Sequence, residues 1–263
     1  QGPLPGLFER DAQGGWTPFV PFETLPRIDF DDPDLRFVDL TGDGRADLLI
    51  TSDAGLFIHP SRGGAGFDAV RRLPLAPDDR AGPRLLFSSP AEGEAILLAD
   101  MTGDGLSDIV RLRHAEVCYW PNLGHGRFGR RVTMSDAPRF GARDRFDPRR
   151  LRLADIDGTG TADLVWIGPD GVWTAANRFG NGFAPARRVA RLPDTAPDTH
   201  IEVLDLLGRG TAALVWSSAR GDGRGGRLCH IDLMPGTKPW LLVAMQNNLG
   251  AETRIDYAPS TRY

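Results

Sequence analysis

The chain has 263 residues, 31 basic and 35 acidic, with a net charge of −4, and it contains 32 glycines, 21 prolines and two cysteines. This length can bury a substantial core, and the frequent glycine and proline fit many short strands joined by turns. We expect no nucleic-acid partner because there is no basic stripe, no direct membrane insertion because no apolar run approaches ~18 residues, and free thiols at Cys118 and Cys229.

The predicted elements form repeated β units. Residues 14–22 read as the last strand of a preceding unit, and the chain begins like a cut from a longer protein, with no signal peptide. Each following repeat has an apolar run before an Asp-Gly loop, a second after it, a third beyond a short turn, and a fourth that begins near Gly-Phe. The repeats lie near residues 35–73, 95–134, 151–192 and 201–245.

The period of 50 to 61 residues and the four short strands per unit predict an all-β fold. We expect a β-propeller of four-stranded antiparallel blades, with about four and a half blades here as part of a larger ring. Residues 1–245 would form this partial propeller. Residues 246–263 would form a hairpin around Asn247-Asn-Leu-Gly250 that leads into a following cage-like β region.

Three of the loops share one pattern of oxygen-bearing side chains. Oxygens fall at loop positions 1, 3, 5 and 9, glycines at 4 and 6, and position 7 would add a backbone carbonyl. Such oxygens suit Ca²⁺, and glycine accepts the positive φ that a tight loop requires. The expected ligands of up to three structural Ca²⁺ are Asp39, Thr41, Asp43, Arg45, Asp47, Asp100, Thr102, Asp104, Leu106, Asp108, Asp155, Asp157, Thr159, Thr161 and Asp163.

The Asp-Gly strings have two alternative interpretations besides nine-residue calcium loops. Asp-Gly strings also mark simple hairpin turns, but a turn does not need several carboxylates packed together, whose mutual repulsion a cation would relieve. The EF-hand pattern is not met, because Ile50, Arg111 and Trp166 stand where it requires Glu. A fourth loop at 205–213 keeps both glycines and Asp205 but lacks the other oxygens, so we expect no metal there.

The loop pattern resembles the FG-GAP or VCBS repeats of integrin-α-like propellers. More specifically, the chain resembles the middle/N-terminal region of the B subunit of bacterial Tc insecticidal toxin complexes. The stretches that resemble it are 35–44, 119–128, 146–157, 214–218 and 247–261.

The resemblance implies a non-enzymatic role. In that family the B subunit and part of the C subunit enclose the toxic piece of C in a β-stranded cage. A propeller in B closes the cage and docks on the A subunit, the translocation channel. The expected partners are thus the A and C subunits, and the protein would be secreted, or released from the bacterial cytoplasm, as part of the toxin complex.

Two other functions stay open at this point. One is a calcium-dependent cell-surface adhesion or carbohydrate-binding propeller; the other is a propeller enzyme, which would need a cluster of inward-facing polar side chains. Gly221–Gly226 matches a dinucleotide fingerprint but lies between strands with no helix to receive a pyrophosphate. The five histidines show no zinc spacing, and no Gly-Xaa-Ser-Xaa-Gly elbow is present.

Overall fold

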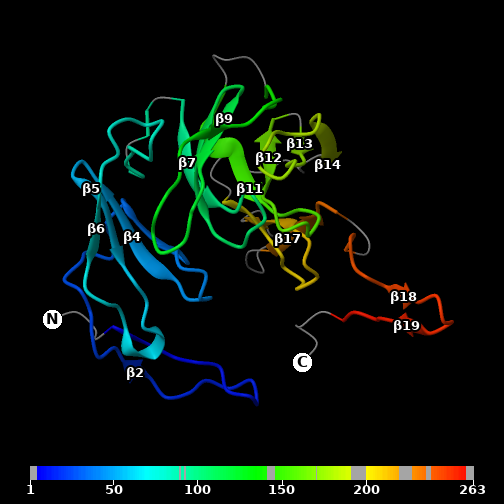
Figure 1. Ribbon diagram of the computed structural model, residues 1–263, viewed down its shortest axis with the longest axis horizontal. Helices are drawn as coiled ribbons and strands as arrows, with labels where there is room; N and C mark the ends of the chain where they lie inside the picture. Colours follow the sequence, from blue (N-terminus) through cyan, green and yellow to red (C-terminus); the bar gives the residue numbers. More distant parts are fainter. Residues whose placement is uncertain are drawn as a thin grey trace. The chain divides into compact units, whose positions relative to one another are not determined.

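A computed structural model describes residues 5–88, 90–91, 93–140, 146–169, 171–190, 200–218, 227–234 and 238–258 (Figure 1). The described residues form small antiparallel sheets and two short 3₁₀ helices, η1 (Gly63–Ala65) and η3 (Pro148–Arg150). The all-β class is therefore confirmed. Within this part of the chain, no helix is long and apolar enough to cross a membrane. The Gly221–Gly226 string lies outside the described residues.

The chain divides into two compact units. The first comprises residues 1–98, 105–112 and 118–133, and the second comprises 99–104, 113–117 and 134–263. The residues of the sheet formed by β7–β10 are divided between the two units.

Three sheets have four strands, which confirms the predicted four-stranded antiparallel units. Their strands follow chain order across each sheet, as in a meander. They are β3 (Leu35–Val38), β4 (Asp47–Ser52), β5 (Gly55–His59) and β6 (Arg71–Pro74); β7 (Ala95–Ala99), β8 (Asp108–Arg113), β9 (Glu116–Trp120) and β10 (Val132–Thr133); and β11 (Leu151–Ala154), β12 (Asp163–Gly168), β13 (Gly171–Ala175) and β14 (Arg187–Ala190). No closed propeller is present among the described residues, and the larger ring stays a prediction.

The fourth strands begin later than the Gly-Phe signals predict, and the reason is the same in every sheet. Each of these phenylalanines forms a single bridge to the residue six positions earlier, which closes a tight turn before the strand starts. These bridges are Ser61–Phe67, Asn122–Phe128 and Asn177–Phe183. The regular strand then starts four residues after each phenylalanine.

The remaining described strands form smaller sheets. β15 (Ile201–Leu204), β16 (Ala213–Ser218) and β17 (Arg227–Asp232) make a three-stranded sheet, and β18 (Ala244–Gln246) pairs with β19 (Glu252–Arg254) in the predicted C-terminal hairpin. At the N-terminal end, β2 (Val20–Pro21) lies in the segment expected to end a preceding blade. It pairs with β1 (Gly6–Leu7), which the sequence did not predict.

The second strand of each repeat lies in the core because it is covered on both faces. β8 is buried from Asp108 to Leu112, and all six residues of β12 are buried. In the first unit a cluster around Leu49, Ile109 and Trp120 joins residues of two repeats. In the second unit, Val165 and Leu214 belong to one cluster that joins the β11–β14 and β15–β17 sheets. This packing anchors the loops that enter the second strands.

Candidate metal centre

Each Asp-Gly loop joins the first and second strands of its sheet, as predicted. Position 1 directly follows the first strand, and position 9 is the first residue of the second strand, as in the Ala154–Asp163 pair of the β11–β12 ladder. All glycines at positions 4 and 6 have positive φ, from 61° at Gly208 to 90° at Gly160. The tight curl that the glycines predicted is therefore confirmed.

The aspartate at position 1 organises the loop backbone. Asp155 Oδ1 accepts hydrogen bonds from the N–H groups of Gly158 at 2.7 Å and Thr159 at 3.1 Å, and its Oδ2 accepts one from Gly160 at 2.9 Å. Asp39 accepts equivalent bonds from Gly42 and Gly44. Burial alone would raise the pKa of Asp39, but these backbone donors outweigh it, and its pKa lies below the usual value.

The aspartate at position 9 is buried and serves a different purpose. Asp163 is only 3% exposed; its Oδ2 accepts from the Ile156 N–H at 3.2 Å and its Oδ1 from the Asn177 N–H at 2.8 Å. Burial, with a smaller contribution from the neighbouring charges of Asp157 and Asp155, raises the pKa of Asp163 to about 7 against the opposing effect of these hydrogen bonds. An ionised carboxylate at this position is therefore costly unless a cation compensates for it.

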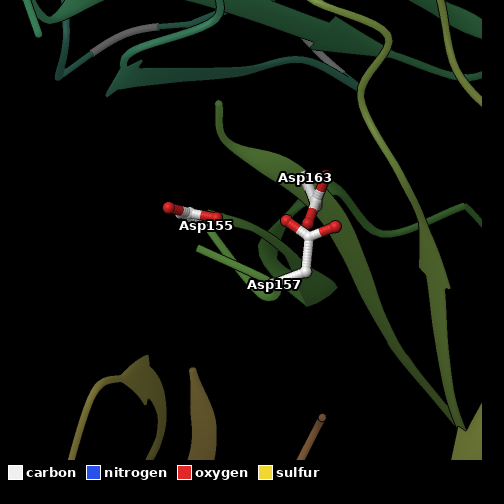
Figure 2. A group of neighbouring side chains, drawn as sticks. All are labelled: Asp155, Asp157 and Asp163. Atoms are coloured by element: carbon white, nitrogen blue, oxygen red, sulfur yellow. The ribbon is translucent and has the colours of Figure 1, made fainter. Parts of the chain in front are cut away.

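The third loop brings three carboxylates together. Oxygens of Asp155, Asp157 and Asp163 all lie within 4.8 Å of one another. Figure 2 shows the carboxylates of Asp157 and Asp163 close together, with Asp155 beside them. Two oxygens bound to one Ca²⁺ at ~2.3–2.6 Å can be at most about 5 Å apart, so this cluster fits a single ion of that kind.

The same loop also contains two threonine hydroxyl groups. The hydroxyls of Thr159 and Thr161 are 3.1 Å apart, and Thr161 is fully buried. All of these side-chain donors are oxygens, which is the ligand type that Ca²⁺ and Mg²⁺ select. The chemistry of the third loop therefore suits a hard divalent cation and offers no soft ligand.

The first loop differs because its third acid is at position 5 instead of position 3. Asp43 is exposed, and its Oδ1 accepts the Arg45 N–H at 2.9 Å, a local turn at the loop tip. Asp47 is buried, and burial raises its pKa, with smaller contributions from Asp43 and Asp39. Among the described residues only the third loop gathers three acids within 4.8 Å. The exposed Arg45 and the partly buried Thr41 complete this loop.

The second loop is divided between the two units. Asp100, Thr102 and Asp104 belong to the second unit, where Asp100 Oδ1 accepts the N–H groups of Thr102 at 3.1 Å and of Gly103 at 2.7 Å. Leu106 and Asp108 belong to the first unit, and Asp108 is fully buried. Position 9 is thus buried in all three loops.

The fourth loop keeps its shape without the other acids. Asp205 still accepts the N–H groups of Arg209 at 2.9 Å and Gly210 at 2.6 Å. The Arg209 guanidinium lies near Asp232, with 3.7 Å between Nη1 and Oδ2. The end of the Lys238 side chain also lies against this loop, since a Cβ added at Gly210 would be 2.8 Å from its Nζ.

Sequence reasoning missed two buried asparagines beside these loops. Asn122 and Asn177 each follow the position-9 aspartate by fourteen residues and donate their backbone N–H to it, at 2.8 Å in both cases. The recurrence of Asn at this offset in two repeats was the available signal.

A second missed arrangement involves Asp79, in the connection between two repeats. Its carboxylate accepts from Arg111 at 3.2 Å and Arg131 at 2.6 Å, and its carbonyl accepts the Trp120 Nε1–H at 2.7 Å. Arg111 also lies over the Trp120 ring, 5.3 Å from its centroid. This network fastens the connection to the sheet, and no sequence motif marks it.

The tryptophans, His125 and the two cysteines lie outside the Asp-Gly loops. Trp120, Trp166 and Trp216 are buried, Trp173 is partly buried, and His125 is exposed in its turn. The two cysteines are free, with Cys118 buried and Cys229 only partly so. A cavity of about 690 Å³ in the first unit is lined mainly by apolar side chains together with His59, Arg27, Asp68 and Arg62.

Comparisons with known proteins agree with this description. Residues 174–263 match the family model described as the insecticide toxin TcdB middle/N-terminal region. No curated protein matches the chain.

Solved structures match over more of the chain. A chain of the Photorhabdus luminescens Tc holotoxin pore, with a mutation in TccC3, is 27% identical with a TM-score of 0.74, over 96% of this chain and 11% of that one. A complex of TcdB2 and TccC3 without the hypervariable C-terminal region matches at 26% identity and a TM-score of 0.52, over 92% of this chain and 11% of that one. An Agrocybe aegerita lectin that recognises non-reducing terminal N-acetylglucosamine matches at 24% identity and a TM-score of 0.53, over 74% and 50%, and shows the fold alone.

The resemblance inferred from the sequence is thereby confirmed: this is a stretch similar to the middle/N-terminal region of the B component of Tc insecticidal toxins. The chain spans about a tenth of the length of the two toxin chains that it matches.

Proposed function

We propose that this chain is a non-catalytic module of a toxin-complex B component, which closes the toxin-enclosing cage and docks on the A subunit. The observation that carries the proposal is the match to a chain of the Tc holotoxin pore, which extends over 96% of the present chain. We further propose that residues 1–245 belong to a propeller ring and that residues 246–263 lead into the cage. The module would act outside the producing bacterium, as part of the complex.

The chemistry of the site supports a structural role. In the third loop, Asp155 and Asp163 accept hydrogen bonds from backbone N–H groups, and the three carboxylates lie within 4.8 Å of one another. We propose that the third loop binds Ca²⁺ through Asp155, Asp157 and Asp163, and that the first and second loops are further sites. A bound Ca²⁺ would neutralise the carboxylates that burial and mutual repulsion disfavour.

A rigid module is useful for gating only if a partner favours one of its arrangements. The A subunit would therefore have to bind the open form of the cage more tightly than the closed one, because a ligand shifts an equilibrium only by its differential affinity. The sheets with their fixed loops would move as units during that change.

The test uses the parent B component assembled with its C component. Deletion of this module should abolish association with the A subunit and toxin delivery while leaving the enclosed toxin protected from protease. Because a deletion can disturb the cage, the triple variant D155N/D157N/D163N provides a second measurement: it should weaken A-subunit binding as calcium removal does. Unchanged binding and delivery after the deletion would refute the proposal, and retention of the B–C assembly on glycan-coated surfaces would favour the adhesion alternative.

A further inference from the structure

Asn177 connects the acidic third loop to the loop that precedes it in the second unit. The side chain is 8% exposed, and its Nδ2 donates to the Met101 carbonyl at 2.9 Å and to the Ala162 carbonyl at 3.0 Å. Its Oδ1 accepts the Gly180 N–H at 2.9 Å, which closes its own turn. Both amide hydrogens are therefore used to join two separate stretches of main chain.

The same residue is tied directly to the metal centre. Its backbone N–H donates to Asp163 Oδ1, while Asp163 Oδ2 accepts from position 2 of the same loop, Ile156. Met101 occupies the equivalent position 2 of the preceding loop. A second bond runs in parallel, from the Ala162 N–H to the Asp100 carbonyl at 2.7 Å. Asp163 is thus connected to Asp100 and Met101 through one side chain and one adjacent backbone bond.

The first unit repeats this arrangement one repeat earlier. The Asn122 N–H donates to Asp108, its Nδ2 donates to the Leu40 carbonyl at 3.4 Å, and its Oδ1 accepts the Gly124 N–H at 2.9 Å. In the first repeat the position is Ser61, whose N–H still donates to the position-9 aspartate at 2.7 Å and whose hydroxyl still accepts in its own turn. Serine has no side-chain amide to donate, so the link to a preceding loop is described for Asn122 and Asn177.

We infer that Asn177 is a positioning residue: it holds Asp163 from one side and the preceding loop from the other, and so couples cation binding in the third loop to the order of residues 100–104. The coupling to cation binding rests on the proposed calcium site. The positioning of Asp163 and of the preceding loop does not depend on that site.

The experiment is hydrogen exchange of the backbone amides in the Asn177→Ser variant, which copies Ser61 and keeps the turn. The matched control is Asn181→Ser, because Asn181 is exposed and its side chain bonds only to carbonyls of the same turn, those of Arg178 and Phe179. In chelator, Asn177→Ser should speed exchange at residues 100–104 by about tenfold, roughly the effect of losing two hydrogen bonds. The control should exchange like the wild type.

Adding calcium tests the positioning role of Asn177 and its coupling to cation binding separately. In an Asp104→Asn background, which removes a ligand of the proposed second-loop site, added Ca²⁺ should slow exchange at residues 155–163 and also at 100–104. In the same background, Asn177→Ser should confine the slowing to residues 155–163. If residues 100–104 exchange equally in wild type and variant in chelator, the positioning role is wrong. If Ca²⁺ slows neither segment of the wild-type chain, the calcium site fails instead, and the comparison in chelator still decides the role of Asn177.

Discussion

Replacing Asp163 by Asn should change the stability of the chain in opposite directions with and without calcium. In chelator at pH 8 the variant should be more stable than the wild type, because it removes a buried carboxylate that is ionised against the cost of burial. In millimolar calcium the order should reverse, because the variant loses a ligand of the proposed ion.

The magnitude follows from the pKa of about 7 for Asp163, compared with an ordinary value of 3.8. Because the folded-state pKa is raised, the folded chain holds this proton more tightly than the unfolded chain. Stability is therefore lost as the pH rises from about 4 to about 7, by roughly 4 kcal/mol at about 1.4 kcal/mol per pH unit. Asn offers one acceptor instead of two to the N–H groups of Ile156 and Asn177, which costs about 1–3 kcal/mol. The net gain at pH 8 in chelator is then about 1–3 kcal/mol.

The assay is urea unfolding of wild type and variant at pH 5 and pH 8, each with chelator or calcium. Calcium at a thousand times its Kd would stabilise the wild type by about 4.1 kcal/mol per site, which exceeds the advantage of the variant in chelator. The control is Asp53→Asn, at an exposed hairpin turn outside the loops, which should behave like the wild type throughout. If the chelated wild type is no less stable at pH 8 than at pH 5, or if the two chains keep the same order in calcium, the reasoning about Asp163 is refuted.

Three further changes test other parts of the structure by thermal or urea unfolding. Gly158→Ala should cost at least about 2 kcal/mol, because its Cβ would overlap Lys238 and lie 2.6 Å from a loop carbonyl, while Gly44→Ala, with similar φ and open space, should cost only about 1 kcal/mol; equal losses would contradict the clash. Asp79→Ala should destabilise the chain by about 1–2 kcal/mol, since two arginines lose an acceptor that is itself partly exposed; an unchanged midpoint would remove the network from the account. Asp205→Ala should cost about 1 kcal/mol equally in calcium and in chelator, and a calcium-dependent loss would show that the fourth loop binds metal after all.

Much of the fold could be predicted from the sequence because its signals are local. The alternating apolar runs and the Asp-Gly loops gave the strands and the hairpins, and the glycines at positions 4 and 6 have the positive φ that was expected of them. The fourth strands were placed too early, since Phe67 and its equivalents close a turn before the strand begins. The pairing of β1 with β2 was not predicted, because these segments are too short to show a periodic pattern in the sequence.

The sequence predicted which residues form the Asp-Gly loops, but it did not predict how the arrangement of acids differs from one loop to the next. Spacing alone treats the first and third loops alike, whereas only Asp157, at position 3, joins its neighbours in a group of three carboxylates. Asn177 was missed because its importance comes from a bond to Met101, 76 residues earlier in the chain. Lys238 was missed for a similar reason, as it reaches the third and fourth loops from a distant segment.

The Asp205 loop shows that this hairpin closes with a single carboxylate and two backbone donors, in the absence of the other acids. By the same reasoning the third loop is ordered before an ion arrives, so the binding free energy of a cation need not be spent on ordering the chain. Such a preorganised loop can exchange its ion quickly, without the hairpin opening. A module of this kind would keep one shape where calcium is scarce and would only stiffen where calcium is plentiful.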